Sequence, residues 1–520
     1  MSKRALISVT DKSGVVEFAR ELNNLGYEVI STGNTFKILK ENGVNAITID
    51  EVTKFPEMLD GRVKTLNPYI HGGILYKRDE KSHVDTVNEY NIGSIDLVVV
   101  NLYDFEGTLK AGKSHEEMIE NIDIGGPSMI RSAAKNYKDV TIIVDVADYD
   151  TDLECGKEIR EEIEKLKNNE LTLEDRKRLA YKAFSTTARY DALISTYFAN
   201  EVGDKYPEIL NLTFQKEQTL RYGENPHQAG ILYSQPNAKN PILNYEQLNG
   251  KELSFNNIND LHGCLEVMRE FKDSEEVVSV AIKHTNPCGV GIGANALEAY
   301  TKCYEADTVS IFGGIVGITS TVDVETAKKL NEIFLEIVVA YDFTEEALDV
   351  LRQKKNLRVL KLAKIEESLQ PYDMKYLDGK LLIQDKNNVL ADKYETVTKV
   401  KPSKEQLKDM EFGMKIVKNM KSNAIVIVKD GQTLASGCGQ TSRIWALKNA
   451  LENNKDKDFK GAVLASDAFF PFDDCVTLAN EYGISAVVQP GGSIKDQDSI
   501  DACDKYEMTM VFTGTRHFKH

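Results

Sequence analysis

The chain has 520 residues, too many for one hydrophobic core, so we expect two to four domains. Its 81 acidic and 64 basic residues give a net charge of -17, which disfavours nucleic acid and anionic membrane surfaces as partners. No run approaches the ~20 apolar residues of a membrane-spanning helix, and MSKRALISVT leads directly into an expected strand, so we expect a cytoplasmic protein.

The seven cysteines are scattered along the chain and include no Cys-x-x-Cys pair. Their odd number and wide spacing favour reduced thiols over disulfides or a zinc cluster. We expect most of them to be buried as small apolar side chains. They are Cys155, Cys264, Cys288, Cys303, Cys438, Cys475 and Cys503.

Short β-rich runs alternate with helical patterns in residues 1–147. This alternation is typical of an α/β domain, a parallel sheet with helices on both faces. The expected strands are 5–9, 28–32, 45–49, 96–102 and 140–145, and 15–27 is an expected helix.

Ligands of parallel sheets bind beyond the carboxyl ends of the strands. In this chain, a polar loop follows each of the first two expected strands. Their hydroxyls, backbone N–H groups and helix starts suit a phosphate, although helix capping explains either loop alone. The loops contain Ser8, Thr10, Asp11 and Lys12, and Thr32, Gly33, Asn34 and Thr35.

Residues 148–200 are charged and helical and are interpreted as a connector. Beyond them, 424–437 predict a hairpin, because Asp430 and Gly431 tolerate the positive φ of a tight turn. A helix, a strand, a helix and a strand follow at 443–454, 461–467, 475–483 and 486–490, an order that resembles the cytidine deaminase fold. Runs 277–289 and 309–320 are expected to be strands that end in Gly-rich turns. They indicate another copy of the deaminase-like unit earlier in the chain. The two units would span 201–365 and 366–520.

Zinc deaminases bind their metal through His-x-Glu at one helix start and Pro-Cys-x-x-Cys at the next. Here Gly291 follows Pro287 and Cys288 where the second cysteine would stand. In the other unit, GQTSR and DAFFPFDD occupy the ligand positions. We therefore expect deaminase-like units without catalytic zinc, which disfavours a nucleoside deaminase.

Seven clusters combine charged, aromatic and turn-forming residues. They are GRVKTLNP (61–68), NLYDF (101–105), DIGGPSMIRSAAKN (123–136), RYGENPHQ (221–228), IKHTNPCG (282–289), GQTSR (439–443) and SDAFFPFDD (466–474). Each is weak alone, but in this order they resemble the bifunctional purine biosynthesis enzymes that carry aminoimidazolecarboxamide ribonucleotide (AICAR) transformylase and inosinate (IMP) cyclohydrolase. The resemblance runs from Lys3 to His520.

That family implies a methylglyoxal-synthase-like cyclohydrolase domain over 1–147 and a transformylase domain of tandem deaminase-like units over 201–520. The transformylase transfers a formyl group from its co-substrate 10-formyltetrahydrofolate to AICAR, and the cyclohydrolase then closes formyl-AICAR to IMP with loss of water. The resemblance further implies AICAR, formyl-AICAR, IMP and folate as ligands, a homodimer with transformylase sites at its interface, and no required metal.

The AICAR amine is a poor nucleophile because its lone pair is delocalised, so transfer needs a base and positive charge near the formyl oxygen. His284 is the expected base, and Lys283 is expected to hold negative charge or protonate the leaving folate nitrogen. Adjacent strand residues point to opposite faces, so the pair converges only if the strand ends at or before it, which a Thr-Asn-Pro turn would allow. Taken alone, the stretch would be interpreted as a solvent lysine beside a core histidine.

Further transformylase residues follow from the resemblance. A planar guanidinium suits a phosphate, and one of the three phenylalanines at 469–472 is expected in the core. The implied roles are AICAR binding for Arg221 and Tyr222, phosphate binding for Arg516, support of the Lys283–His284 pair for His227, nucleotide hydrogen bonds for Asn257 and Asn423, a place beside the site for Arg443, walls for Phe469 and Phe472, and folate binding for Asp474.

In the N-terminal half the resemblance makes Lys64, Tyr103, Asp123 and Lys135 the ring-closing group. Attack of the carboxamide nitrogen on the formyl carbon is intramolecular, so holding the reactive rotamer supplies much of the rate. A lysine and a tyrosine can relay protons, and the Asp-Ile-Gly-Gly turn offers N–H groups to the oxyanion. The implied substrate contacts are Ser8, Thr10, Lys12, Thr32, Gly33, Thr35, Arg62, Thr65, Asn101 and Gly125.

Two residues depart from the family pattern. Asp104 stands where proline is frequent, and Asn34 where glycine is usual, although asparagine tolerates left-handed backbone.

Two alternatives stay open. One is an allosteric sensor domain, against which Lys64 and Lys135 argue, and the other is a monofunctional transformylase with a non-catalytic, nucleotide-sensing N-terminal domain.

Overall fold

The computed structural model describes residues 3–149, 165–166, 168, 170–235, 238, 241–368, 370 and 372–520. The chain divides into two compact units, Met1–Phe214 and Gln215–His520. Cys155 and the part of the expected connector at 150–164 lie outside the described residues. Within the described ranges, no helix is both long and apolar enough to cross a membrane.

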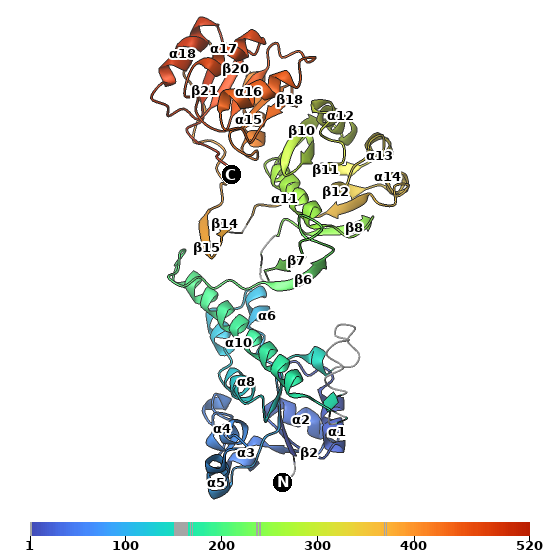
Figure 1. Cartoon of the computed structure of the whole chain (residues 1–520), viewed down its shortest axis with the longest axis vertical. Coiled ribbons are helices and arrows are strands. Elements are labelled where there is room, and N and C mark those ends of the chain that lie inside the picture. Colours follow the sequence, from blue (N-terminus) through green and yellow to red (C-terminus); the bar gives the residue numbers. More distant parts are fainter. Residues whose placement is uncertain are drawn as a thin grey trace. The chain divides into compact units, whose positions relative to one another are not determined.

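A five-stranded sheet with the order β3-β2-β1-β4-β5 forms the centre of the first unit (Figure 1). All four strand pairs are parallel, which confirms the predicted sheet. The strand order reverses between β1 and β4, and ligands of such sheets bind at this point of the carboxyl edge. The strands are β1 (Lys3–Ser8), β2 (Tyr27–Ser31), β3 (Ala46–Thr48), β4 (Leu97–Val100) and β5 (Thr141–Ile143).

Helices cover both faces of this sheet, as predicted. Phe18 of α1 and Leu39 of α2 pack into the core on one face, and Ile70 of α4, Ile130 of α8 and Leu179 of α10 pack on the other. The helices are α1 (Val15–Asn24), α2 (Gly33–Glu41), α3 (Ile49–Thr53), η1 (Leu59–Gly61), α4 (Pro68–Leu75), α5 (Lys81–Glu89), α6 (Phe105–Lys110), α7 (His115–Glu120), α8 (Gly125–Lys135), η2 (Val146–Asp148) and α10 (Leu173–Glu201). Because α10 packs on α8 and β5, its part of the expected connector belongs to the first unit.

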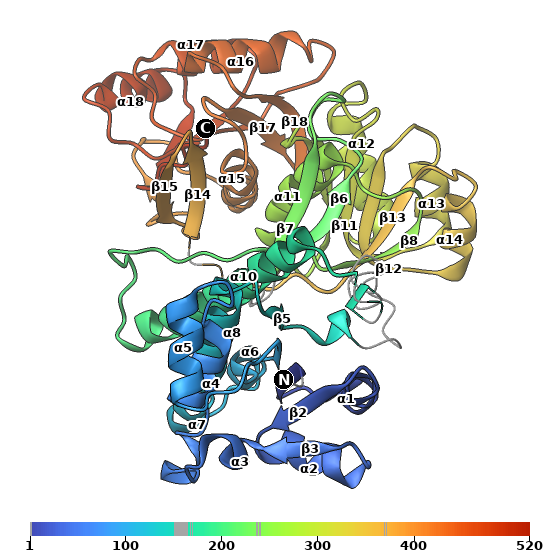
Figure 2. The same cartoon turned by 60° about the horizontal axis from the view of Figure 1, so that its bottom comes forward.

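A twelve-stranded sheet with the order β16-β21-β20-β19-β17-β18-β10-β9-β11-β12-β13-β8 forms the second unit. Two separate two-stranded ribbons, β6–β7 and β14–β15, accompany it (Figure 2). The strands are β6 (Gln215–Leu220), β7 (Gly230–Ser234), β8 (Tyr245–Asn249), β9 (Val277–Lys283), β10 (Asn286–Gly293), β11 (Ile315–Val322), β12 (Ile337–Phe343), β13 (Arg358–Leu362), β14 (Tyr372–Leu377), β15 (Lys380–Asp385), β16 (Glu395–Thr396), β17 (Ile425–Lys429), β18 (Gln432–Gly437), β19 (Val463–Ser466), β20 (Ala486–Gln489) and β21 (Thr509–Phe512).

This sheet repeats one arrangement twice. Each half has an antiparallel hairpin, three mutually parallel strands and an antiparallel edge strand: β9–β10 with β11, β12, β13 and β8, then β17–β18 with β19, β20, β21 and β16. The two hairpins meet where β10 pairs with β18.

The helices repeat in the same way. Leu261 of α11 and Met410 of α15 pack in one core, whereas Tyr300 of α12 and Leu447 of α16 belong to separate cores of the first and second halves. The helices are α11 (Phe255–Arg269), α12 (Ala296–Ala306), α13 (Val324–Leu330), α14 (Glu345–Leu351), α15 (Lys404–Val417), α16 (Arg443–Glu452), α17 (Asp474–Glu481) and α18 (Asp496–Lys505). The predicted hairpin, helices and strands of 424–490 are therefore confirmed.

Two predicted strand boundaries of the first half are wrong. The strand in 309–320 begins at Ile315, after Gly313 and Gly314, and the residues from Asn286 to Gly289 already belong to β10. The apolar residues Val309 and Phe312 suggested a strand, but they are exposed in the loop before β11. Apolar character alone does not distinguish a short strand from a loop.

Candidate active sites

The loops after β1 and β2 meet at the carboxyl edge of the first unit's sheet. The hydroxyls of Ser8 and Thr32 lie 2.9 Å apart, and Thr35 Oγ1 donates to the carbonyl of Val9 at 3.0 Å. Gly33 carries a positive φ of 45° at the start of α2. Glycine therefore holds the left-handed position of this loop, and the departure at Asn34 lies inside the helix.

The loop after β4 joins the same edge. Asn101 Oδ1 accepts the backbone N–H groups of Thr10 and Asp11, the latter at 3.0 Å. Lys12 Nζ donates to the carbonyl of Thr10 at 2.9 Å. The structure thus brings the predicted phosphate residues of the first two loops together with Asn101.

Lys64 also lies at this edge. Its Nζ is 3.2 Å from Glu57 Oε1 and 3.7 Å from the position that a Cβ on Gly33 would take. Arg62, by contrast, is exposed and forms an ion pair with Glu120. Unlike Arg62, Lys64 is therefore held beside the phosphate loop.

Asp123 precedes α8 and accepts the N–H of Gly126 at 2.7 Å. Burial raises the pKa of Asp123, while the backbone amides of Gly126 and Tyr103 and the charge of Lys64 oppose this shift. The hydroxyl of Tyr190, from α10, accepts the Asp123 N–H at 2.8 Å. The structure therefore groups Lys64, Asp123 and the Tyr103 backbone. Sequence reasoning missed Tyr190, which belongs to no cluster.

The start of α8 also touches Thr65, a predicted substrate contact that is buried. A Cβ on Gly125 would lie 2.6 Å from Thr65 Oγ1, so glycine is required for this close approach. Asp104, the other departure, caps α6, because its Oδ1 accepts the Gly107 N–H at 2.8 Å.

We expect Asp123→Asn to have a higher melting temperature than the wild type at pH 7. The folded-state pKa of Asp123 is raised, so its contribution to stability is fully present below the unfolded pKa and is lost as pH rises through the folded pKa. Asparagine removes the buried charge and keeps an oxygen for Gly126. Thermal scans at pH 7 and below the unfolded pKa test this, and an equal or lower melting temperature at pH 7 would contradict it.

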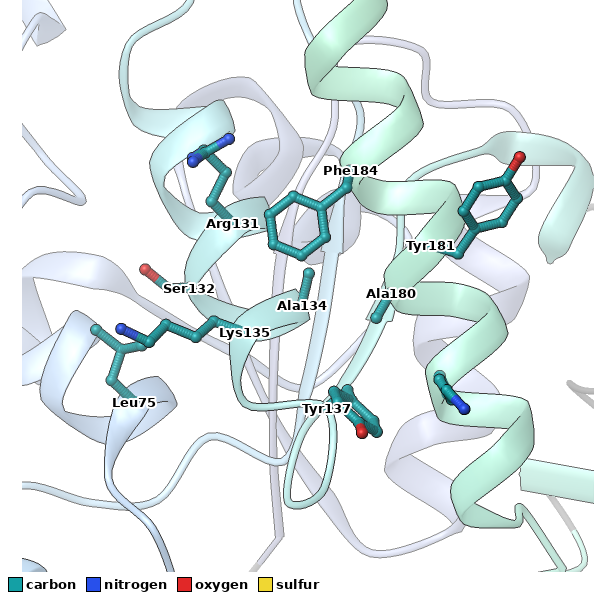
Figure 3. A pocket seen from close by; sticks show the side chains of 10 residues that line it. Leu75, Arg131, Ser132, Ala134, Lys135, Tyr137, Ala180, Tyr181 and Phe184 are labelled. Atoms are coloured by element: carbon teal, nitrogen blue, oxygen red, sulfur yellow. The ribbon is translucent and has the colours of Figure 1, made fainter.

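Lys135 lies apart from this group, at the last position of α8. A rise of about 1.5 Å per residue places its Cα about 15 Å from that of Gly125. It lines a cavity of about 620 Å³ together with Arg131, Tyr137 and Phe184 (Figure 3). Lys135 therefore lies at the opposite end of α8 from Gly125, and its role in ring closure stays a prediction.

In the second unit, β9 ends at Lys283, and His284 and Thr285 form a two-residue hairpin turn before Asn286. Both turn residues have positive φ, 50° and 63°. Lys283 Nζ donates to the carbonyls of Phe312 and Gly313 at 2.8 and 3.0 Å. The strand thus ends before His284, which is the condition under which the two side chains were expected to converge.

Asp260 of α11 lies against this turn. Its Oδ1 accepts the Thr285 N–H at 2.8 Å. Burial raises the pKa of Asp260, and the Thr285 amide and the charges of His284 and Lys283 oppose the shift. Sequence reasoning missed Asp260, because it lies in a helical run without a motif and only the fold places it beside the turn.

The predicted AICAR residues Arg221 and Tyr222 lie in the loop between β6 and β7. The Arg221 guanidinium is 5.6 Å from the centroid of the Tyr222 ring. Asn256 Nδ2 donates to the carbonyl of Glu224 at 3.2 Å and so joins this loop to the start of α11. His227, in the same loop, is exposed. The helix that carries Asp260 therefore also holds the predicted AICAR loop.

Asn257 is part of the α11 capping box. Its Oδ1 accepts the backbone N–H and the hydroxyl of Ser254 at 3.1 and 2.9 Å. Because this oxygen is engaged in capping, a nucleotide would meet the Nδ2 group of Asn257.

A loop of the second half lies next to the His284 turn. Asn286 Nδ2 donates to the His284 carbonyl at 3.0 Å, and Asn286 Oδ1 accepts the Lys421 N–H at 3.0 Å. Asn423, two residues further along, donates through Nδ2 to the Gln440 carbonyl at 2.9 Å. Asn286 therefore connects the two halves at the candidate site.

Arg443 and Asp467 form a buried ion pair behind this loop. Arg443 Nη2 also donates to Asn423 Oδ1 at 2.7 Å, and the Ser422 hydroxyl donates to Asp467 Oδ2 at 2.6 Å. Sequence reasoning missed Asp467, although it lies within a cluster. Arg443 thus lies beside the predicted site as a buried support of Asn423.

We expect Asp467→Ala to lower the free energy of unfolding by about 3 kcal/mol, because it leaves the buried Arg443 charge without its partner. Trp445, the single tryptophan of the chain, lies on α16 two residues after Arg443. Urea unfolding followed by its fluorescence measures the effect. Asp458→Ala, at a residue exposed in the loop after α16, is the control. Equal stability of the two variants would contradict the prediction.

The remaining predicted residues lie further along the chain. Phe470 is fully buried in the core, whereas Phe472 is exposed with Lys495 Nζ 4.8 Å from its ring centroid. Phe469 is half-buried, Asp474 begins α17, and the exposed Arg516 guanidinium lies 4.4 Å from the ring centroid of Phe518. The expectation of one core phenylalanine is confirmed, and the other roles stay predictions.

The six described cysteines are free thiols, and four of them are buried. Among the residues that the structure describes, no group of three or more His, Cys, Asp or Glu side chains is placed to hold a metal ion.

Comparison with known proteins reveals the family. A profile of the AICARFT/IMPCHase bienzyme matches residues 133–453, and one of MGS-like domains matches residues 14–128. The chain is 82% identical to the bifunctional purine biosynthesis protein PurH of Clostridioides difficile (strain 630) and 52% identical to PurH of Thermoanaerobacter sp. (strain X514), in both cases over 100% of each chain.

A solved structure, "Crystal structure of ForH", is 32% identical, covers 38% of this chain and 100% of its own, and has a TM-score of 0.32. The family profile and the full-length relatives confirm the resemblance seen in the motifs. The chain therefore belongs to the AICARFT/IMPCHase bienzyme family and is a bifunctional AICAR transformylase and IMP cyclohydrolase.

Proposed function

We propose that the second unit transfers a formyl group from 10-formyltetrahydrofolate to AICAR at the His284 turn. We propose that the first unit closes formyl-AICAR to IMP at the carboxyl edge of its sheet. The match of an MGS-like domain to residues 14–128 supports a separate site in the first unit. The observation that carries the proposal is that each unit holds its own proton-carrying group: Lys283 with His284, and Lys64 with Asp123.

In the transformylase, the AICAR amine attacks the formyl carbon and gives a proton to His284. The bond from the formyl carbon to the folate nitrogen breaks, and that nitrogen takes a proton from Lys283. Two backbone carbonyls hold the Lys283 ammonium beside the turn, where its charge can stabilise the formyl oxygen as negative charge develops. The loop of Arg221 and Tyr222, joined to the start of α11, would bind AICAR.

In the cyclohydrolase, the carboxamide nitrogen attacks the formyl carbon of the same molecule, and water leaves. The hydroxyls and amides around Ser8 and Thr32 would bind the phosphate and so fix the reacting rotamer. Lys64 and Tyr103 would move protons, and Asp123 would orient the start of α8 through Gly126. Only the family resemblance supports a role of Lys135 in ring closure, because Lys135 lines the cavity at the other end of α8.

The repeated strand order supports the proposal of tandem deaminase-like units over 201–365 and 366–520. Neither unit has the Pro-Cys-x-x-Cys ligands of zinc deaminases, so the proposed chemistry uses the lysine and histidine pair. The family resemblance supports a cytoplasmic homodimer with transformylase sites at its interface, and the net charge of -17 supports small-molecule ligands over nucleic acid or membranes.

An absorbance assay of the purified chain with AICAR and 10-formyltetrahydrofolate tests both assignments. Tetrahydrofolate release and IMP formation are followed separately, and we expect both. Tetrahydrofolate release without IMP formation, even from added formyl-AICAR, would contradict the assignment of the first unit. Absence of tetrahydrofolate release would contradict the assignment of the second.

A further inference from the structure

The His284 turn adopts a backbone that its second residue, Thr285, does not favour. His284 and Thr285 both have positive φ, a region that residues other than glycine seldom adopt, although Asn, Asp and His do so more often than the rest. The cost is highest for a β-branched residue such as Thr285. Such a conformation persists only where the surrounding structure holds it.

Helix α11 holds this turn at two positions nearly one helical turn apart. Asp260 accepts the Thr285 N–H at 2.8 Å. A Cβ on Gly263 would lie 3.2 Å from the Thr285 carbonyl oxygen and 3.3 Å from its Cα, so the turn rests directly on the helix there. The hydrogen bond fixes the orientation of the Thr285 N–H group. The contact at Gly263 limits how closely the turn can approach α11.

In the second half of the sheet, a helix aspartate likewise accepts backbone N–H groups of a hairpin turn, although no catalytic group is proposed there. Asp409 of α15 accepts the N–H groups of Asp430 and Gly431, the turn of the β17–β18 hairpin, at 2.9 and 3.0 Å. Asp-Gly favours this turn by itself. In the first half the helix aspartate instead holds a His-Thr turn that needs support.

We propose that Asp260 is a positioning residue of the transformylase, which through Thr285 fixes the direction of His284 relative to Lys283. This inference rests on the proposed role of His284 as the base. Asp260 does not need to touch substrate, so its removal should lower kcat and leave KM for AICAR and 10-formyltetrahydrofolate unchanged. A catalytic group misplaced by about 1 Å can lose about 100-fold in rate.

The test compares kcat and KM of the full-length wild type, Asp260→Ala, Asp260→Asn and Asp409→Ala. We expect Asp260→Ala to lower kcat for tetrahydrofolate release by about 10- to 100-fold. Asp260→Asn should restore most of it, because the amide oxygen can accept the Thr285 N–H. Asp409→Ala removes the matching aspartate from a turn near Ile292, at the opposite end of β10 from His284, and should keep kcat close to wild type.

Three results would overturn the proposal: wild-type kcat in Asp260→Ala, an Asn variant as slow as the Ala variant, or an equal loss in Asp409→Ala. Asn259→Ala, at an exposed neighbour on α11, controls for a change in the helix itself. Trp445 fluorescence reports whether the second unit is folded in each variant. If Asp260→Ala fails to fold, the folded Asn variant still decides, because a kcat lowered about 10-fold or more there would show that the hydrogen bond to Thr285 is not what Asp260 supplies. An inactive wild type would contradict the proposed function instead.

Discussion

Replacement of Lys283 by alanine is expected to lower tetrahydrofolate release from AICAR and 10-formyltetrahydrofolate about 1000-fold. The ammonium is held by the carbonyls of Phe312 and Gly313, so it supplies positive charge at a fixed place without reorganisation. Alanine also removes the proposed acid for the folate nitrogen. The same preparation should still convert added formyl-AICAR to IMP, because that reaction is assigned to the first unit. Both reactions are followed by absorbance.

Lys429→Ala is the matched control for this variant. Lys429 is the last residue of β17, the position that Lys283 holds in β9, and its Nζ likewise donates to a backbone carbonyl, that of Lys460, at 2.9 Å. The control should release tetrahydrofolate at the wild-type rate. A similar loss in both variants would show a general effect of a strand-end lysine. Wild-type turnover in Lys283→Ala would remove Lys283 from the proposed mechanism.

In the Lys64→Ala variant, formyl-AICAR is expected to accumulate while tetrahydrofolate is released at the wild-type rate. Lys64 lies beside Gly33, and its charge lowers the pKa of Asp123, which burial raises. Its loss therefore removes positive charge from the place where the oxyanion is proposed to form. We expect IMP formation from formyl-AICAR to fall about 1000-fold. Chromatography of the quenched reaction separates formyl-AICAR from IMP and measures the two products directly.

Lys37→Ala, at an exposed lysine on α2, removes the same charge from the same unit and should form IMP normally. If Lys64→Ala also forms IMP normally, the ring-closing group must be sought elsewhere, and the cavity that contains Lys135 becomes the next place to test. If Lys64→Ala instead loses tetrahydrofolate release, the division of the two activities between the units is wrong.

The two hairpin turns of the second unit show what local sequence predicts. The turn at Asp430 and Gly431 was predicted because both residues tolerate positive φ by themselves. The turn at His284 and Thr285 was placed too late in the chain, at Thr-Asn-Pro, because a β-branched residue such as Thr285 does not favour that backbone. The support comes from Asp260, 25 positions before Thr285, and no local pattern shows such a contact.

Lys135 shows a different limit. The motif DIGGPSMIRSAAKN placed it with Asp123, because resemblance associates residues by their order along the chain. Because α8 begins at Gly125, the helix rise alone places the Cα of Lys135 about 15 Å from the Cα of Gly125. Resemblance to a motif therefore identified the cluster but not the distance between its ends.

The sequence by itself determined the family, the two activities and most local elements of this protein. Strand and helix patterns are properties of a few neighbouring residues, and seven clusters in a consistent order identified the bienzyme. Only the tertiary structure decided which distant residues meet: Asn101 with Thr10, Tyr190 with Asp123, Asp260 with Thr285, and Asp467 with Arg443. The physical reason is that sheet and helix packing join residues tens of positions apart, and local conformational preferences carry no information about those contacts.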